Sequence, residues 1–219
     1  MQRSRNWLAV IALLGAVTAA YADGPGGYRP KERGDVPVSE QGAVDAYTAG
    51  YASILRAEHA ENLAAAASND AERKEASSNA QKAYAASLPN FESAVRLDSS
   101  MHEAYTYLGY ANRKLGRYDE ALRAYDQALK INPNTPYAIE YQGEAFLGLN
   151  RIDEARFNFL RLYALDEYQA AKLLHAMSAW IEANRAKPPA GIDVPALAAW
   201  VAERSAELKT VPGENLWGN

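Results

Sequence analysis

A repeat of 34 residues constrains this chain of 219 residues more than any other feature. Gly109 and Gly143 are separated by that interval. The other matched pairs are Asp119 and Asp153, Glu120 and Glu154, Ala121 and Ala155, and Tyr125 and Phe159. Matches at one fixed period over many positions predict a repeat architecture, in which each unit buries its apolar face against its neighbours.

The matched positions suit two antiparallel helices in each unit. Gly109 and Ala121 are small, so the two helices can approach closely at these points. Apolar residues at helical spacing fill the seam between the helices: Tyr105, Leu108, Tyr125 and Ala128.

Turn residues separate the expected helices. Gly116 can adopt the left-handed conformation that closes a helix, and the next helix is expected from Asp119. Pro133 cannot continue the second helix. Another helix should then begin with Thr135 as its N-cap and Pro136 as its first residue.

These residues resemble the tetratricopeptide repeat family, whose signature positions hold Tyr105, Leu108, Gly109, Ala121, Tyr125, Ala128 and Pro133. Asn112 departs from the pattern, because the family usually has an aromatic residue there. Glu167 replaces the closing proline of the second unit, which is therefore expected to continue without the usual break. The resemblance covers residues 102–166 well and 68–101 in part. It implies an all-α solenoid of about three helical hairpins.

The chain divides by composition and periodicity into six parts. They are a signal peptide (1–22), a flexible linker (23–42), N-terminal helices with an atypical first repeat (43–101), two clear repeats (102–167), capping helices (168–209) and a tail (210–219). Helices are expected over 43–67 and 71–97, with Pro89 either kinking the second or marking its start. The conformation of residues 68–90 stays open. Ser100 and Glu103 predict a capping box.

The C-terminal region predicts two further helices. The apolar face of the first, over residues 167–185, should hold Tyr168, Ala171, Leu174 and Trp180. A break at residues 187–191 precedes a last helix from Asp193, which should fold back on the stack or into its groove. The apolar residues of that helix are Leu197, Trp200, Val201 and Leu208.

Residues 1–22 look like a secretory signal. Arg3 and Arg5 precede an apolar stretch over residues 7–17, and Ala20-Tyr21-Ala22 offers a cleavage site. A spanning helix needs about 20 apolar residues, so a cleaved signal is expected and an uncleaved anchor is the alternative. The expected location is the periplasm, with no stable membrane insertion after cleavage.

Composition excludes several classes of site. The chain has no cysteine, which rules out disulfides, thiolate zinc sites and cysteine nucleophiles. Its formal net charge of −4, or −6 without Arg3 and Arg5, argues against nucleic acid as a partner.

No catalytic residue, cofactor or metal site is predicted. His59, His102 and His175 are far apart in sequence and lack the spacing of metal ligands. The Asp-Glu pairs at Asp119 and Asp153 recur with the repeat, at helix N-termini where negative charge is favoured. They are therefore interpreted as structural, and the chain is predicted not to be an enzyme.

The resemblance implies a concave groove lined by the first helix of each repeat. Its positions correspond to Glu103, Thr106, Tyr110, Arg113, Lys114, Tyr137, Glu140, Glu144 and Leu147. Tyrosines beside mixed charges suit recognition of a protein or peptide. A partner segment that carries both positive and negative charges would fit. Some family members clamp a C-terminal carboxylate with Lys and Asn at positions that here hold Thr106, Tyr110, Glu140 and Glu144, so the resemblance implies no such clamp.

The sequence thus predicts a non-catalytic scaffold or adaptor of the cell envelope. The alternative is a periplasmic small-ligand or polysaccharide-binding module, in which tyrosines and Trp217 stack on sugars in a deep aromatic pocket. Self-association through the last helix or Trp217 is a further possibility. The identity of the partner and the pathway stay open.

Overall fold

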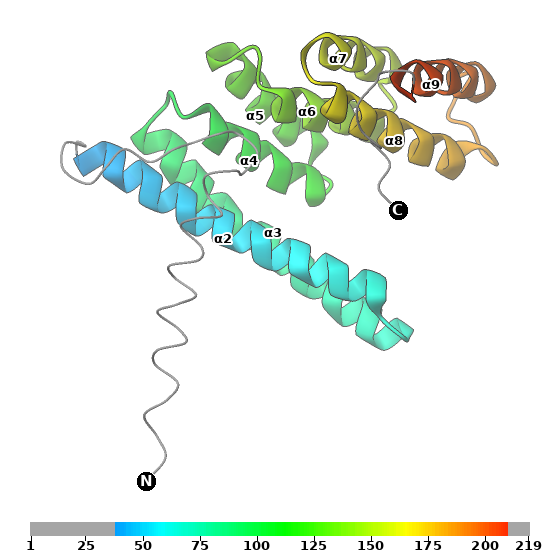
Figure 1. Cartoon of the computed structure of the whole chain (residues 1–219). Helices are drawn as coiled ribbons and strands as arrows, with labels where there is room; N and C mark the ends of the chain where they lie inside the picture. Colours follow the sequence, from blue (N-terminus) through cyan, green and yellow to red (C-terminus); the bar gives the residue numbers. More distant parts are fainter. Residues whose placement is uncertain (1–37, 210–219) are drawn as a thin grey trace.

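The computed structural model describes residues 38–209, which form eight helices and no strand. Figure 1 shows them succeeding one another along a stack, from the blue α2 to the red α9. Their bounds are α2 (Val38–Ala66), α3 (Asp70–Leu97), α4 (His102–Lys114), α5 (Tyr118–Ile131), α6 (Pro136–Gly148), α7 (Ile152–Leu165), α8 (Glu167–Asn184) and α9 (Val194–Lys209). The predicted all-α solenoid is confirmed. The predictions for residues 1–22 and 210–219, and for most of the linker, lie outside the described residues.

Consecutive helices pair as four hairpins: α2 with α3, α4 with α5, α6 with α7 and α8 with α9. The first helices of successive hairpins also contact one another, and the second helix of each hairpin contacts the first helix of the next. The helices expected to cap the stack therefore continue it as a fourth hairpin. No helix among residues 38–209 combines the length and apolar character needed to cross a membrane.

The repeat glycines lie where a neighbouring side chain leaves no room for a Cβ atom. A Cβ at Gly109 would lie 2.4 Å from the ring of Tyr125, which is fully buried. At Gly143 the nearest side chain belongs to Leu173 of α8, at 2.6 Å. Gly109 thus permits close packing of α4 on α5 within one hairpin. Gly143, at the same position of the next repeat, permits close packing of α6 on α8 of the following hairpin.

The turn inside each central hairpin contains a residue with left-handed backbone conformation. Gly116 has φ +74°, as predicted, and Asn150, the matching residue of the next repeat, has φ +59°. Asn tolerates this conformation better than other side-chain-bearing residues. The helix after Gly116 begins at Tyr118 rather than at Asp119.

Replacing Gly116 by alanine is expected to destabilise the protein by about 1 kcal/mol. No atom outside the local chain lies within 4 Å of the added Cβ, so the cost comes from the backbone alone. Urea denaturation would measure it, with Gly116→Asn as the milder control. Equal losses for the two variants would contradict a backbone origin.

The N-terminal hairpin is much longer than the others. Its helices α2 and α3 have 29 and 28 residues, against 13 and 14 in α4 and α5, and its far end projects past α4 (Figure 1). Helix α2 starts at Val38, so the last part of the expected linker is helical. Helix α3 runs through Pro89, which does not mark its start. Phe91 is buried, as the repeat register predicts.

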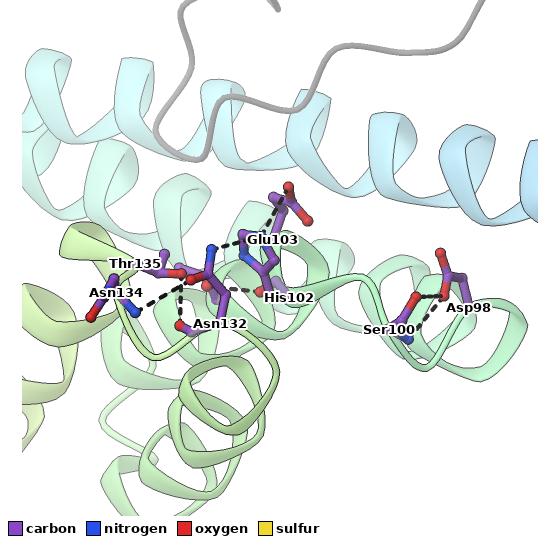
Figure 2. A network of polar contacts seen from close by, with 8 residues as sticks. Asp98, Ser100, His102, Glu103, Asn132, Asn134 and Thr135 are labelled. Carbon is purple, nitrogen blue, oxygen red and sulfur yellow. Dashed lines mark hydrogen bonds and ion pairs between the residues drawn. The ribbon is translucent and has the colours of Figure 1, made fainter.

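The predicted capping box before α4 is wrong. In a capping box the Ser100 backbone N–H would donate to the Glu103 carboxylate, but here it donates to Asp98 Oδ1 at 2.8 Å, and the Ser100 hydroxyl donates to the same atom at 2.6 Å (Figure 2). The N-cap position belongs to Met101, whose side chain makes no capping bond.

Thr135 occupies the N-cap position of α6 and Pro136 follows at its start, as predicted. Its hydroxyl, however, donates backwards to the Asn132 carbonyl at 3.0 Å (Figure 2). His102 Nε2 lies 3.3 Å from Asn132 Nδ2 and 3.4 Å from Glu103 Oε1. These contacts join the turn before α4 to the turn before α6.

The second repeat, predicted to continue without the usual break, is separated from α8 by one residue only. Helix α7 ends at Leu165, and Asp166 is extended. The Asp166 side chain accepts a hydrogen bond from the Gln169 N–H at 3.0 Å and so caps α8. A single residue therefore replaces the four-residue turn over 132–135, because an aspartate can cap the next helix where Pro133 could not.

The face that α8 buries also differs in one residue. Ala171 and Leu174 are buried as predicted, but Tyr168 is 55% exposed. Helix α9 starts after Asp193, which caps it by accepting from the Ala196 N–H at 2.9 Å. Because the ring of Trp200 packs on Phe159 of α7 at 5.2 Å, α9 folds back on the stack.

Candidate partner-binding surface

The nine predicted groove residues lie on α4 and α6, which are adjacent in the middle of the stack. None of them is freely exposed. Thr106, Tyr110, Glu140 and Leu147 are buried, and Glu103, Arg113, Lys114, Tyr137 and Glu144 are partly buried. The prediction of an open groove over all nine positions is therefore too broad.

Tyrosine rings form a continuous row across the first helices of three hairpins. Ring centroids are 5.1 Å apart between Tyr51 and Tyr107, 6.2 Å between Tyr107 and Tyr110, and 4.9 Å between Tyr110 and Tyr141. Tyr137 lies 6.2 Å from Tyr141 at the end of the row. Edge-to-face and tilted pairs of this kind add to the burial of the rings. Burial also raises the pKa of Tyr107 and Tyr110, which keeps their hydroxyl groups neutral.

The basic residues of α4 are paired inside the chain. The Arg113 guanidinium binds the Glu144 carboxylate of α6 and lies 5.2 Å from the ring centroid of Tyr110. Lys114 Nζ lies 2.7 Å from Glu61 Oε1 of α2. These charges, expected to face a partner of both signs, therefore neutralise one another between neighbouring hairpins.

The C-terminal half of α4 is also tied to the long N-terminal hairpin. The Tyr110 hydroxyl donates to Glu58 Oε1 at 3.0 Å, and Gln81 Nε2 donates to the Lys114 carbonyl at 3.2 Å. The 34-residue repeat does not predict these contacts, because they come from the part of α2 and α3 that exceeds the repeat length.

A profile of the tetratricopeptide repeat family matches residues 102–135, which comprise α4, α5 and the turn that follows. The chain thus contains a tetratricopeptide repeat (TPR). None of the curated proteins compared with it shows a significant match. TPR repeats generally mediate protein–protein interactions, and proteins of the family are typically non-catalytic scaffolds.

Two side chains beside the predicted groove residues are exposed where α8 meets α6. Tyr168 is exposed, and Lys172 Nζ lies 5.8 Å from its ring centroid. Tyr137 is partly buried beside them, and its pKa is raised by burial and by the nearby Asp166, Tyr168 and Glu140. We name Tyr137, Tyr168 and Lys172 the α6–α8 surface.

Sequence reasoning missed Tyr168 and Lys172 because it treated α8 as a cap. A signal for Tyr168 was present: this residue follows its N-cap, Asp166, by two positions, as Tyr137 follows Thr135. Counted from the caps, Tyr168 is thus the counterpart of a predicted groove residue.

Glu140 is the buried acid beneath this surface. Glu140 is only 1% exposed, and neither of its carboxylate oxygens makes a hydrogen bond of normal geometry. Burial, together with the nearby Glu144, raises its pKa well above the ordinary value, while Arg113 and Lys172 act in the opposite direction. The folded protein therefore favours the protonated form of Glu140.

Replacing Glu140 by glutamine is expected to stabilise the protein at neutral and alkaline pH. Because the folded-state pKa is raised, the unfolded chain releases this proton first as the pH passes about 4.3, the ordinary value for glutamate. Stability then falls with rising pH until the folded-state pKa is reached. Thermal unfolding from pH 4 to 9 should show a flatter profile for the variant. Glu144→Gln, which breaks the Arg113 pair, should instead lose stability.

Among residues 40–208 no group of three His, Asp or Glu side chains is placed to hold a metal ion. One surface cavity of about 420 Å³ contains none of the nine predicted groove residues. It lies between α5 and the turn after α6, and Arg151 stacks 4.6 Å above the ring centroid of Phe146 there. Its lining consists of Asp119, Leu122, Arg123, Asp126, Phe146 and Arg151.

Proposed function

We propose that this TPR protein is a non-catalytic scaffold that binds a protein or peptide segment across the α6–α8 surface. The observation that carries the proposal is the exposure of Tyr168 and Lys172 beside Tyr137, on helices whose other large apolar side chains are buried or partly buried in the stack. Tyrosines provide large contact area at low entropic cost and are enriched at binding hot spots.

The chemistry of this surface favours a particular kind of segment. Lys172 offers an ammonium group to a partner carboxylate, and the rings of Tyr137 and Tyr168 offer apolar area. Arg113 and Lys114 do not add to the positive charge, because Glu144 and Glu61 pair with them. The proposed partner therefore presents an apolar side chain next to an acidic one.

The cell envelope is the proposed location, with the protein in the periplasm. The support is the sequence of residues 1–22, with its basic start, short apolar stretch and small residues. Fusing alkaline phosphatase, which is active only after export, to the whole chain and to residues 23–219 tests this. Activity in both fusions, or in neither, would contradict export by this segment.

Site-specific photo-crosslinking in cells tests the binding surface. A photoreactive residue at Tyr168 or Lys172 is expected to capture one protein, and the same residue at Arg123 or Lys130 of α5 serves as an exposed control. Tyr137→Ala should weaken capture at position 168 without loss of the helical signal. Equal capture at the control positions would reject the surface, and capture of glycan alone would favour the polysaccharide-binding alternative.

A further inference from the structure

Exposed apolar side chains concentrate on the outer side of α7. Five of the nine large hydrophobic residues exposed among residues 40–208 lie between positions 157 and 168. Phe157 is 61% exposed and Leu160 is 52% exposed, and Ala164 is exposed beside them. Their spacing places all three on one side of the helix. We call Phe157, Leu160 and Ala164 the α7 face.

The preceding repeat shows that the fold does not require this apolar face. Thirty-four residues earlier, the same positions of α5 hold Arg123, Asp126 and Lys130, all of them exposed. Two helices with equivalent places in the stack thus present a charged face and an apolar face. Exposed apolar patches on soluble proteins commonly mark a contact with another segment.

Two sides of α7 are packed within the stack. Phe159 and Leu162 are fully buried in the core, and the ring of Trp200 on α9 packs against Phe159. The Arg156 guanidinium lies 4.7 Å from the centroid of the Trp200 ring. Helix α9 therefore covers the side of α7 next to the α7 face and leaves that face itself open.

We propose that residues 210–219 of the same chain dock on the α7 face, with Leu216 and Trp217 against Phe157 and Leu160. The direction of α9 places this segment nearby. Trp200 contacts Phe159, and Arg204, one turn later, is close enough to Tyr163 to interact electrostatically. The two helices therefore run in the same direction, and α9 ends about one turn beyond the level of Leu165, the last residue of α7.

The segment is long enough to reach the face. Eight residues separate Lys209 from Trp217, which allows a span of about 26 Å at 3.3 Å per residue. Eight helical residues separate Leu165 from Phe157, which is about 12 Å along α7. Pro212 lacks the N–H that a continuing helix needs, so the sequence allows the chain to turn back toward the face after α9.

The chemistry of the segment matches that of the face. Leu216 and Trp217 are its large apolar residues near the end, and a tryptophan buries 150–250 Å² when it docks. Glu214 is its one charged side chain. Arg161, which donates to the Pro133 carbonyl at 2.9 Å, follows Leu160 on α7 and supplies the opposite charge.

The absence of native cysteines allows a direct test in the full chain. Cysteines at Asp153, one turn before Phe157 on the same side of α7, and at Gly218 would report docking by disulfide formation within one chain. The matched control pairs Gly218→Cys with Asp119→Cys, the same residue one repeat earlier on α5. The Asp153 pair should form at least about fivefold faster, since docking raises the local thiol concentration.

Trp217→Ala, added to both pairs, should remove that difference while circular dichroism stays unchanged. Equal rates for the two pairs before this change would overturn the proposal. A disulfide at the mass of a dimer would also overturn it, because the tail of a second copy would then cover the face.

Discussion

Replacing Arg113 by alanine should lower the free energy of unfolding by about 3 kcal/mol, the cost of leaving a buried charge without its partner. Its guanidinium pairs with Glu144 where both side chains are largely shielded from water, at 13% and 26% exposure. It also lies between the rings of Tyr110 and Tyr141. Without it, Glu144 and the buried Glu140 would face each other with only Lys172 to offset them.

Urea denaturation at pH 7 measures the loss, and two variants interpret it. Arg185 and Glu182 form an exposed pair at 2.6 Å, so Arg185→Ala should cost about 0.5 kcal/mol or less. Arg113→Met combined with Glu144→Gln removes both charges and retains side-chain volume, and should restore much of the stability. If Arg113→Ala costs no more than Arg185→Ala, the pair contributes nothing beyond a surface contact.

Replacing Phe91 by alanine should cost about 3–5 kcal/mol, as expected for a fully buried aromatic ring. The ring stacks on Tyr107 of α4 at 5.8 Å, and a Cβ at Gly50 of α2 would lie 2.8 Å from it. Phe91 therefore joins both helices of the long hairpin to the next repeat. Its loss would leave a cavity between three helices.

Thermal unfolding measures this effect, with Leu97→Ala on the same helix as the control. Leu97 is largely exposed, so its truncation should cost much less. A small loss for Phe91→Ala would mean that the N-terminal hairpin is not packed on the TPR stack through this ring.

The sequence predicted the parts of the fold that obey the repeat. Gly109 under Tyr125, Gly116 in the left-handed turn and Phe91 in the core follow from matching positions, because each is set by local packing of one hairpin. The fourth hairpin was missed because Asp166 ends one helix and caps the next without the Asn-Pro-Asn turn that marks the earlier junction.

The candidate site was predicted less well than the fold. Periodicity identified which face of α4 and α6 carries Thr106, Tyr110 and Glu140, but not how far the adjacent helices bury that face. That burial depends on α2, whose Glu58 and Glu61 reach α4 from a hairpin longer than the repeat. The spacing of apolar residues within one helix does not predict contacts of this kind with another helix.

Asp166 has a mechanical consequence for recognition. Its N–H donates to the Leu162 carbonyl at 2.7 Å, and its side chain accepts from Gln169, so one residue closes α7 and opens α8. Each bond anchors Asp166 to one of the two helices, so this junction of a single residue limits how far α8 can move relative to α7. Because α8 also packs on α6, Tyr137, Tyr168 and Lys172 are held in place before any partner arrives. Binding there would lose little conformational entropy on the side of this protein.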